Sequence, residues 1–80
     1  GDLDAAAAPA GPEPSDAVVA LRVALRRLPA EQRALLALRY DEDFDLRDIA
    51  AVLGIPEGTV KSRLHHAREN LRGLLDRMQP

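Results

Sequence analysis

Apolar residues recur at spacings of three and four along most of this 80-residue chain, which is the period of an amphipathic α-helix. The first apolar stripe consists of Val18, Leu21, Leu25 and Leu28. Ser15 or Asp16 is suited to cap this helix, which we predict to run to Arg27. Pro29 then starts a second predicted helix, which continues to about Tyr40. Its core-facing residues are predicted to be Leu35, Leu36 and Leu38.

The next stretch predicts two helices joined by a tight turn. Asp45 can cap the first of them, with Asp48 in the acid position of a capping box, and the helix is predicted over residues 46–53. Gly54 supplies the positive φ that ends it, and Pro56 suits the first turn of the next helix. The apolar residues of this pair are Phe44, Ile49, Val52, Leu53, Ile55, Val60, Leu64, Ala67, Leu71, Leu74 and Met78. The fold class is therefore predicted to be all-α, a small four-helix domain that ends in a helix-turn-helix with a long recognition helix.

Opposite its apolar stripe, the last helix carries short polar and cationic side chains. They include Gly58, Thr59, Lys61, Ser62, His65, His66 and Arg68. Hydroxyl and imidazole groups can bond to base edges or phosphates, while Lys and Arg neutralise phosphates and can bond to guanine. For an isolated basic helix, a solvated bundle surface would be the better interpretation. The turn pattern of Ala50, Gly54 and Val60 favours double-stranded DNA instead.

Two segments resemble the C-terminal promoter-binding domain, region 4, of extracytoplasmic-function sigma factors. They are LPAEQRALLALRY at 28–40 and DIAAVLGIPEGTVKSRLHHARENLR at 48–72, and the resemblance covers roughly residues 17–78. It implies a domain that recognises the promoter element near position −35 and docks on the β flap of the RNA polymerase core. It also implies control by an anti-sigma factor.

The resemblance further implies which residues contact DNA. Base and phosphate contacts transfer to Lys61, Ser62, His65 and His66, with Thr59, Arg63 and Arg68 as backbone or supporting contacts. Many members carry Arg where this chain has His66, so the base preference does not transfer directly, because a neutral imidazole lacks the guanidinium fork. At the LPxxxR position we expect Arg33 to form an ion pair with an acid of segment 41–48.

The formal net charge of −2 is unusual for a DNA-binding protein, but the charge is segregated along the chain. Residues 1–16 carry −4, residues 17–40 carry +4, residues 41–55 carry −4 and residues 56–80 carry +2. The local field steers phosphate contacts, so specific binding stays possible while nonspecific binding should be weak. The arginines Arg22, Arg26, Arg27 and Arg39 are interpreted as solvated or paired within their helices.

Residues 1–15 are predicted to be a flexible acidic linker rich in Ala and Pro, and residues 16–80 the helix-turn-helix domain. The alternative for the linker is an acidic arm that contacts a partner. The absence of cysteine is neutral about compartment. No long apolar run and no signal-peptide pattern are present, so a cytoplasmic protein without membrane insertion is expected.

Other chemistries fit the sequence poorly. His65 and His66 diverge by about 100° on a helix, so they cannot both ligate one metal, and Ser62 has no convincing orienting acid. We therefore expect no enzymatic activity, no cofactor, no metal and no small-molecule substrate. Two alternative functions stay open: the DNA-binding output domain of a response regulator, and a protein-docking module with secondary DNA contact.

Overall fold

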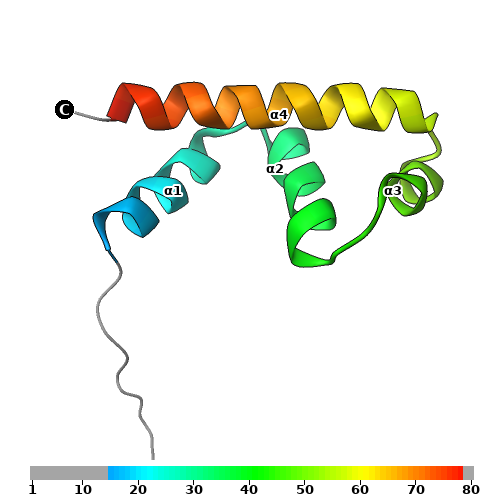
Figure 1. Ribbon diagram of the computed structural model, residues 1–80, viewed down its shortest axis with the longest axis horizontal. Helices are drawn as coiled ribbons and strands as arrows, with labels where there is room; N and C mark the ends of the chain where they lie inside the picture. Colours follow the sequence, from blue (N-terminus) through cyan, green and yellow to red (C-terminus); the bar gives the residue numbers. More distant parts are fainter. Residues whose placement is uncertain (1–14, 79–80) are drawn as a thin grey trace, which may run out of the picture.

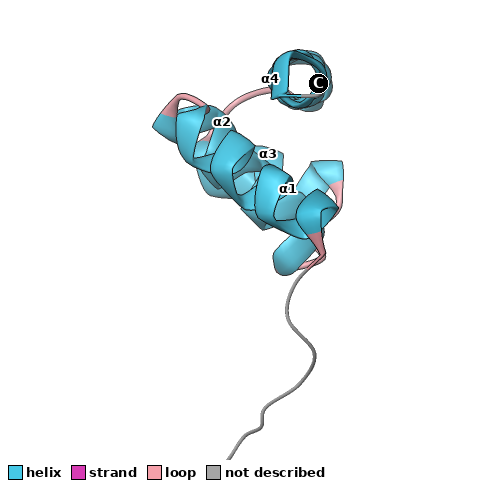
Figure 2. Ribbon diagram, turned by 90° about the vertical axis from the view of Figure 1, so that its left-hand side faces the viewer, coloured by secondary structure: helices cyan, strands magenta, loops and turns pink. Residues whose placement is uncertain are grey.

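The computed structural model describes residues 15–78, and the predicted linker lies outside this range except for Ser15. Its helices are α1 (Asp16–Arg27), α2 (Ala30–Leu36), the π-helix η1 (Ala37–Asp41), α3 (Leu46–Leu53) and α4 (Glu57–Met78). No strand occurs in the described part of the chain. The long α4 spans the molecule, and α1, α2 and α3 all lie on one side of it (Figures 1 and 2). The predicted all-α fold with four α-helices and a final helix-turn-helix is confirmed.

Local signals set the helix ends as expected. The Val18 N–H donates to Ser15 Oγ at 3.3 Å, which makes Ser15 the N-cap of α1. Gly54 ends α3 with φ 69°, and its N–H donates to the Ala50 carbonyl. A left-handed residue at this point turns the chain sharply, and only glycine adopts it without a steric cost. The turn therefore brings α4 back across α3.

The second helix differs from the prediction in its last turn. A π-helix, Ala37–Asp41, follows α2 where one regular helix to Tyr40 was predicted. The Glu42 N–H donates to the Ala37 carbonyl and the Phe44 N–H to the Leu38 carbonyl, each at 3.0 Å. This wide turn has a packing reason, since Leu38 and Phe44 both pack against the hydrophobic core. Phe44, one of the apolar residues named from the sequence, is partly buried there.

The core lies along the inner face of α4. Its buried residues are Leu28, Leu35, Leu36, Ile49, Val60, Leu64 and Ala67. Four predicted core residues are wrong, because Val18, Leu21, Val52 and Leu53 are 39%, 38%, 60% and 43% exposed. The two on α1 lie in its N-terminal half, where α1 slants away from α4 and finds no described partner (Figure 1). Helical spacing thus identified the apolar side of each helix. It could not show which part of that side a neighbouring helix covers.

The expected ion pair of Arg33 is also wrong. Its Nη1 donates to the backbone carbonyls of Leu25, Arg26 and Leu28 at 3.2, 3.2 and 3.3 Å, and within residues 15–78 no acid of segment 41–48 pairs with it. The last carbonyls of a helix have no intrahelical donor and carry the negative end of the helix dipole. The guanidinium of Arg33 therefore caps the C-terminus of α1 and ties α1 to α2.

The N-terminus of α3 is closed by a reciprocal pair of hydrogen bonds. The Asp48 N–H donates to Asp45 Oδ1 at 2.8 Å, and the Asp45 N–H donates to Asp48 Oδ2 at 3.2 Å. The first of these bonds is the main reason that the pKa of Asp45 lies below its ordinary value. The capping box inferred from the sequence is confirmed.

This cap predicts a pH dependence of stability. Because folding lowers the pKa of Asp45, its contribution is fully present above the ordinary carboxyl value of about 4 and is lost as the pH falls through the lower folded value. Asp45→Asn keeps a good N-cap without the titration. We expect the wild-type melting temperature to fall more steeply than that of D45N below about pH 4. Parallel curves for the two proteins, measured by circular dichroism, would contradict this role for the carboxylate.

Candidate nucleic-acid interface

The N-terminal half of α4 presents a polar surface because its opposite side is fixed in the core. Val60, Leu64 and Ala67 are 0%, 1% and 0% exposed and hold one side of the helix against its neighbours. Residues two or five positions away then project from the other side. Of the predicted contact residues, six are exposed and Thr59 is half-buried. The exposed ones are Lys61, Ser62, Arg63, His65, His66 and Arg68.

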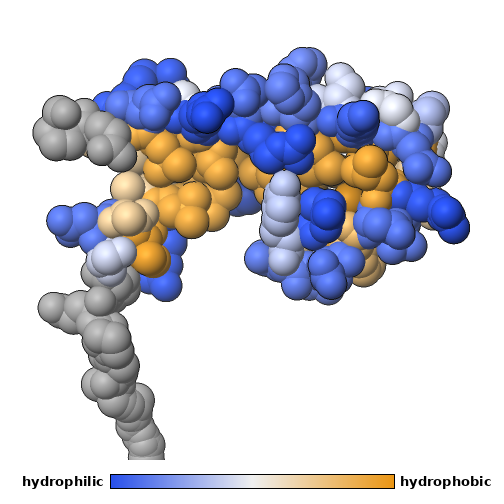
Figure 3. Space-filling view, in the orientation of Figure 1, coloured by the Kyte–Doolittle hydropathy of each residue, from blue (hydrophilic) through white to orange (hydrophobic). Residues whose placement is uncertain are grey.

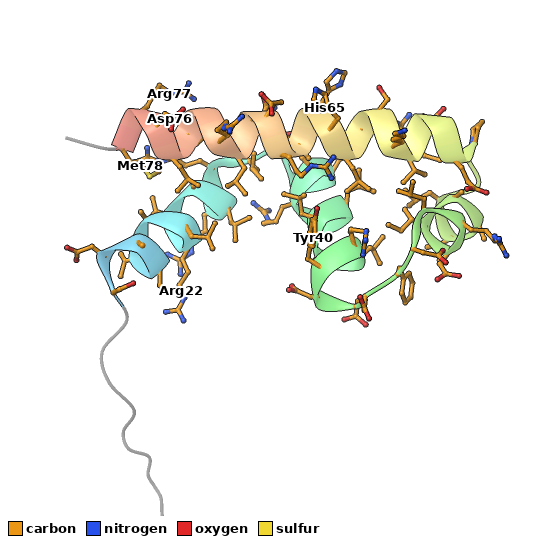
Figure 4. The ribbon with its side chains drawn as sticks, in the orientation of Figure 1. Arg22, Tyr40, His65, Asp76, Arg77 and Met78 are labelled. Atoms are coloured by element: carbon orange, nitrogen blue, oxygen red, sulfur yellow. The ribbon has the colours of Figure 1, made fainter. Side chains whose placement is uncertain are left out.

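This surface stands clear of the rest of the described molecule. The upper edge of Figure 3, which follows α4, is largely hydrophilic, while the apolar side chains gather between α4 and the helices below it. His65 points away from the other helices (Figure 4). An α-helix with its side chains is about 10–12 Å across, and the major groove of B-DNA is about 12 Å wide. An unobstructed helix of this kind can enter the groove.

Electrostatics support an anionic partner at this end of α4. Lys61, Arg63 and Arg68 place three cationic groups within the first twelve residues of the helix, where Glu57 is the acid of the first turn. The N-terminal end of a helix also carries partial positive charge on its unpaired N–H groups. No polar or charged side chain is buried within residues 15–78, so these groups act from the surface. Phosphates along a duplex provide the matching negative charge.

The structure does not bring all the predicted residues onto one face. The rings of His65 and His66 lie 5.9 Å apart between centroids, with their planes inclined by 55°. Arg63 and His66 line an open hollow of about 500 Å³, which Glu31, Leu38 and Leu53 also line. Arg68 turns to the opposite flank and donates from Nη1 to the Tyr40 hydroxyl at 3.2 Å. The surface therefore has a central strip and two unlike flanks.

Tyr40 was missed by the sequence interpretation. It lies 28 residues before Arg68 and on another helix, so no spacing rule links the two side chains. A further contact between helices joins Asn70 Nδ2 of α4 to Gln32 Oε1 of α2 at 2.8 Å. Both pairs join α4 to the helices beneath it. Only the tertiary arrangement makes them visible.

Comparison with known proteins agrees with this architecture. Residues 19–71 match the family described as Sigma-70, region 4. The chain belongs to the sigma-70 region 4 family. That match includes α2, α3 and the part of α4 that carries the candidate interface.

Curated relatives with this domain are sigma factors of the extracytoplasmic-function class. The chain is 40% identical over 65 residues to the ECF RNA polymerase sigma factor SigW of Bacillus subtilis, covering 74% of this chain and 35% of that protein. It is 43% identical over 60 residues to the ECF sigma factor SigM of Mycobacterium tuberculosis, covering 75% of this chain and 31% of that protein. For SigL of the same organism the identity is 51% over 49 residues, covering 61% and 28%. The chain thus spans about a third of the length of these relatives.

Two structural findings bear on other kinds of site. Within residues 15–78, no three His, Asp or Glu side chains gather closely enough to hold a metal ion. None of the helices described is both long enough and apolar enough to cross a membrane.

Proposed function

We propose that this region 4 domain binds the promoter element near position −35, as part of a cytoplasmic ECF sigma factor that directs bacterial RNA polymerase to start transcription. The observation that carries the proposal is the exposed polar side of α4, held out by a buried stripe on the same helix. Lys61, Ser62, His65 and His66 would contact bases and phosphates in the major groove. Thr59, Arg63 and Arg68 would contact or support the backbone, and no catalytic step is involved.

Region 4 would also dock on the polymerase core through its β flap, with an anti-sigma factor as a competitor for the same domain. Support comes from apolar side chains that the described domain leaves uncovered. Val18, Val19 and Leu21 of α1 are 39%, 47% and 38% exposed. Such a surface on the side of α1 and α2 would leave the outer side of α4 available to DNA. In this arrangement one domain would both dock on a protein and bind DNA, so the protein-docking alternative becomes a second role of the same domain.

The family match distinguishes this proposal from the response-regulator alternative. The matched residues, 19–71, run through the helix-turn-helix, and the relatives are named as ECF RNA polymerase sigma factors. A docking module whose DNA contact is secondary would share the fold. It would not be expected to select a duplex sequence.

Selection from a random duplex library tests the proposal with the 80-residue chain itself. At low salt we expect the immobilised chain to enrich one short sequence motif, because base contacts from α4 add to phosphate contacts. Binding to the enriched duplex should weaken steeply with added salt, since each neutralised phosphate releases counterions. A final pool indistinguishable from the starting library would contradict sequence-specific binding and favour the docking module.

A further inference from the structure

Tyr40 joins the π-helix to the recognition helix. It lies in η1, is 57% exposed, and its hydroxyl accepts the hydrogen bond from Arg68 Nη1 at 3.2 Å. Figure 4 shows Tyr40 beneath α4, beside α2. A large aromatic side chain this exposed adds little to the core. Its contact with Arg68 therefore calls for another explanation than packing.

A second guanidinium approaches the same ring. The Cζ atom of Arg39 lies 5.5 Å from the centroid of the Tyr40 ring, within the range of a cation–π contact. Within residues 15–78, no carboxylate lies within 4.0 Å of either arginine. Two cations thus gather around one phenol without a described anionic partner. Such a cluster is suited to bind an anion.

The hydroxyl of Tyr40 has hydrogen-bonding capacity left over. It accepts the bond from Arg68 through a lone pair, so its own O–H can still donate. A phosphate oxygen accepts bonds from hydroxyl and guanidinium groups, and charge-assisted bonds of this kind are the stronger ones. Arg68, held through one nitrogen, keeps further N–H donors for the same phosphate. The three side chains therefore offer convergent donors to a phosphodiester group.

The cluster lies where a duplex backbone would pass. Lys61 and Arg68 are seven residues apart, two helical turns, and so project from the same flank of α4. Tyr40 meets Arg68 on that flank. If the central strip of α4 enters the major groove, the strands that border the groove run along its flanks. π-Helical turns also occur frequently at functional sites.

We propose that Tyr40 serves DNA binding in two ways: it positions Arg68 toward a backbone phosphate, with Arg39 kept beside it, and it donates its own hydroxyl hydrogen to the same phosphate. The inference rests on the proposed function, because it needs duplex DNA on α4. The inference adds a DNA contact from Tyr40 of η1 to the DNA contacts made by the helix-turn-helix. The ligand is the phosphodiester group, so the contribution is independent of base sequence.

Tyr40→Phe removes the hydroxyl and keeps the ring, which makes it the sharpest variant. Using the duplex enriched by the wild-type chain, we expect Y40F to bind at least about tenfold more weakly, as for one lost hydrogen bond with a charged partner. Arg68→Gln should lower the slope of log affinity against log salt by about one, and Y40F should lower it partly. In the R68Q background, Y40F should cost clearly less than in the wild type, because only its own bond to the phosphate is then lost and there is no Arg68 left to position. Arg77→Gln, near the C-terminal end of α4, is the matched control.

The outcomes separate this inference from the proposed function. Failure of the wild-type chain to enrich a duplex overturns the proposed function, and the phosphate contact falls with it. If the wild type enriches a duplex but Y40F binds it with the same affinity and the same salt slope, the role of Tyr40 is overturned and the proposed function stands. A loss in Y40F that persists undiminished beside R68Q also overturns it, since Tyr40 would then not act through Arg68. Equal melting temperatures for Y40F and wild type are expected, and a lowered one in Y40F would assign the hydroxyl to stability instead.

Discussion

Replacing both Lys61 and Ser62 by alanine is expected to abolish protection of the promoter element by this domain while leaving its helical circular dichroism unchanged. Both side chains are exposed on α4 beside the buried Val60. A good base contact contributes about 1–3 kcal/mol of discrimination, so two lost contacts predict a weakening of about a hundredfold. Alanine is the best helix former, so α4 should persist. DNase footprinting on the enriched duplex measures the effect.

The matched control for this variant removes a positive charge elsewhere on the same helix. Arg77→Ala deletes an exposed cation in the last turn of α4, far from the N-terminal half. Its footprint should resemble that of the wild type. An undiminished footprint for the Lys61 and Ser62 variant would show that DNA lies on another face. Equal losses in both variants would indicate a nonspecific charge effect.

The parts of the fold that followed from the sequence are those set by neighbouring residues. Asp45 and Asp48 cap α3, Gly54 ends it at φ 69°, and Pro56 precedes α4, all within one turn of the residues they act on. The inner stripe of α4 was predicted equally well, because Val60 and Leu64 belong to one helical period. The exposed side of α4 could then be inferred as the side opposite this buried stripe. These features carry the candidate site.

The features that were missed depend on residues distant in sequence. Arg33 caps α1 from α2, and Arg68 bonds to Tyr40 across 28 residues. The π-helix forms where Leu38 and Phe44 must both meet a core supplied mainly by other helices. No local pattern encodes such partners. The two flanks of α4 therefore differ in a way that a helical wheel could not anticipate.

Charge explains how an acidic chain can carry this interface. Asp45 and Asp48 are engaged in the cap of α3, and within residues 15–78 no ion pair joins an acid of segment 41–48 to α4. The outer edge of α4 is hydrophilic (Figure 3), and its cations Lys61, Arg63 and Arg68 are exposed. Affinity for a duplex then depends on a local cationic surface and not on the net charge of −2. Acidic residues elsewhere are expected to limit nonspecific binding.

Leu64→Ala is expected to leave the domain largely unfolded at room temperature. Leu64 is 1% exposed and belongs to the cluster that joins α4 to α1, α2 and α3. Leucine-to-alanine changes in cores cost about 3–5 kcal/mol, through lost transfer free energy and the cavity that remains. A single core of this size supplies only about 3–5 kcal/mol of stability. Urea titration followed by circular dichroism measures the loss, and DNA binding should disappear with it.

Leu53→Ala is the matched control, because it makes the same chemical change at a position that is 43% exposed. Little apolar area leaves the core and no closed cavity forms, so its cost should stay below about 1 kcal/mol. Spacing placed both Leu53 and Leu64 on apolar stripes, and the pair of variants tests whether the observed difference in burial governs stability. Equal losses would mean that Leu53 is covered in solution. The expected inequality locates the stabilising contacts on the inner side of α4, which is what holds its outer side free for DNA.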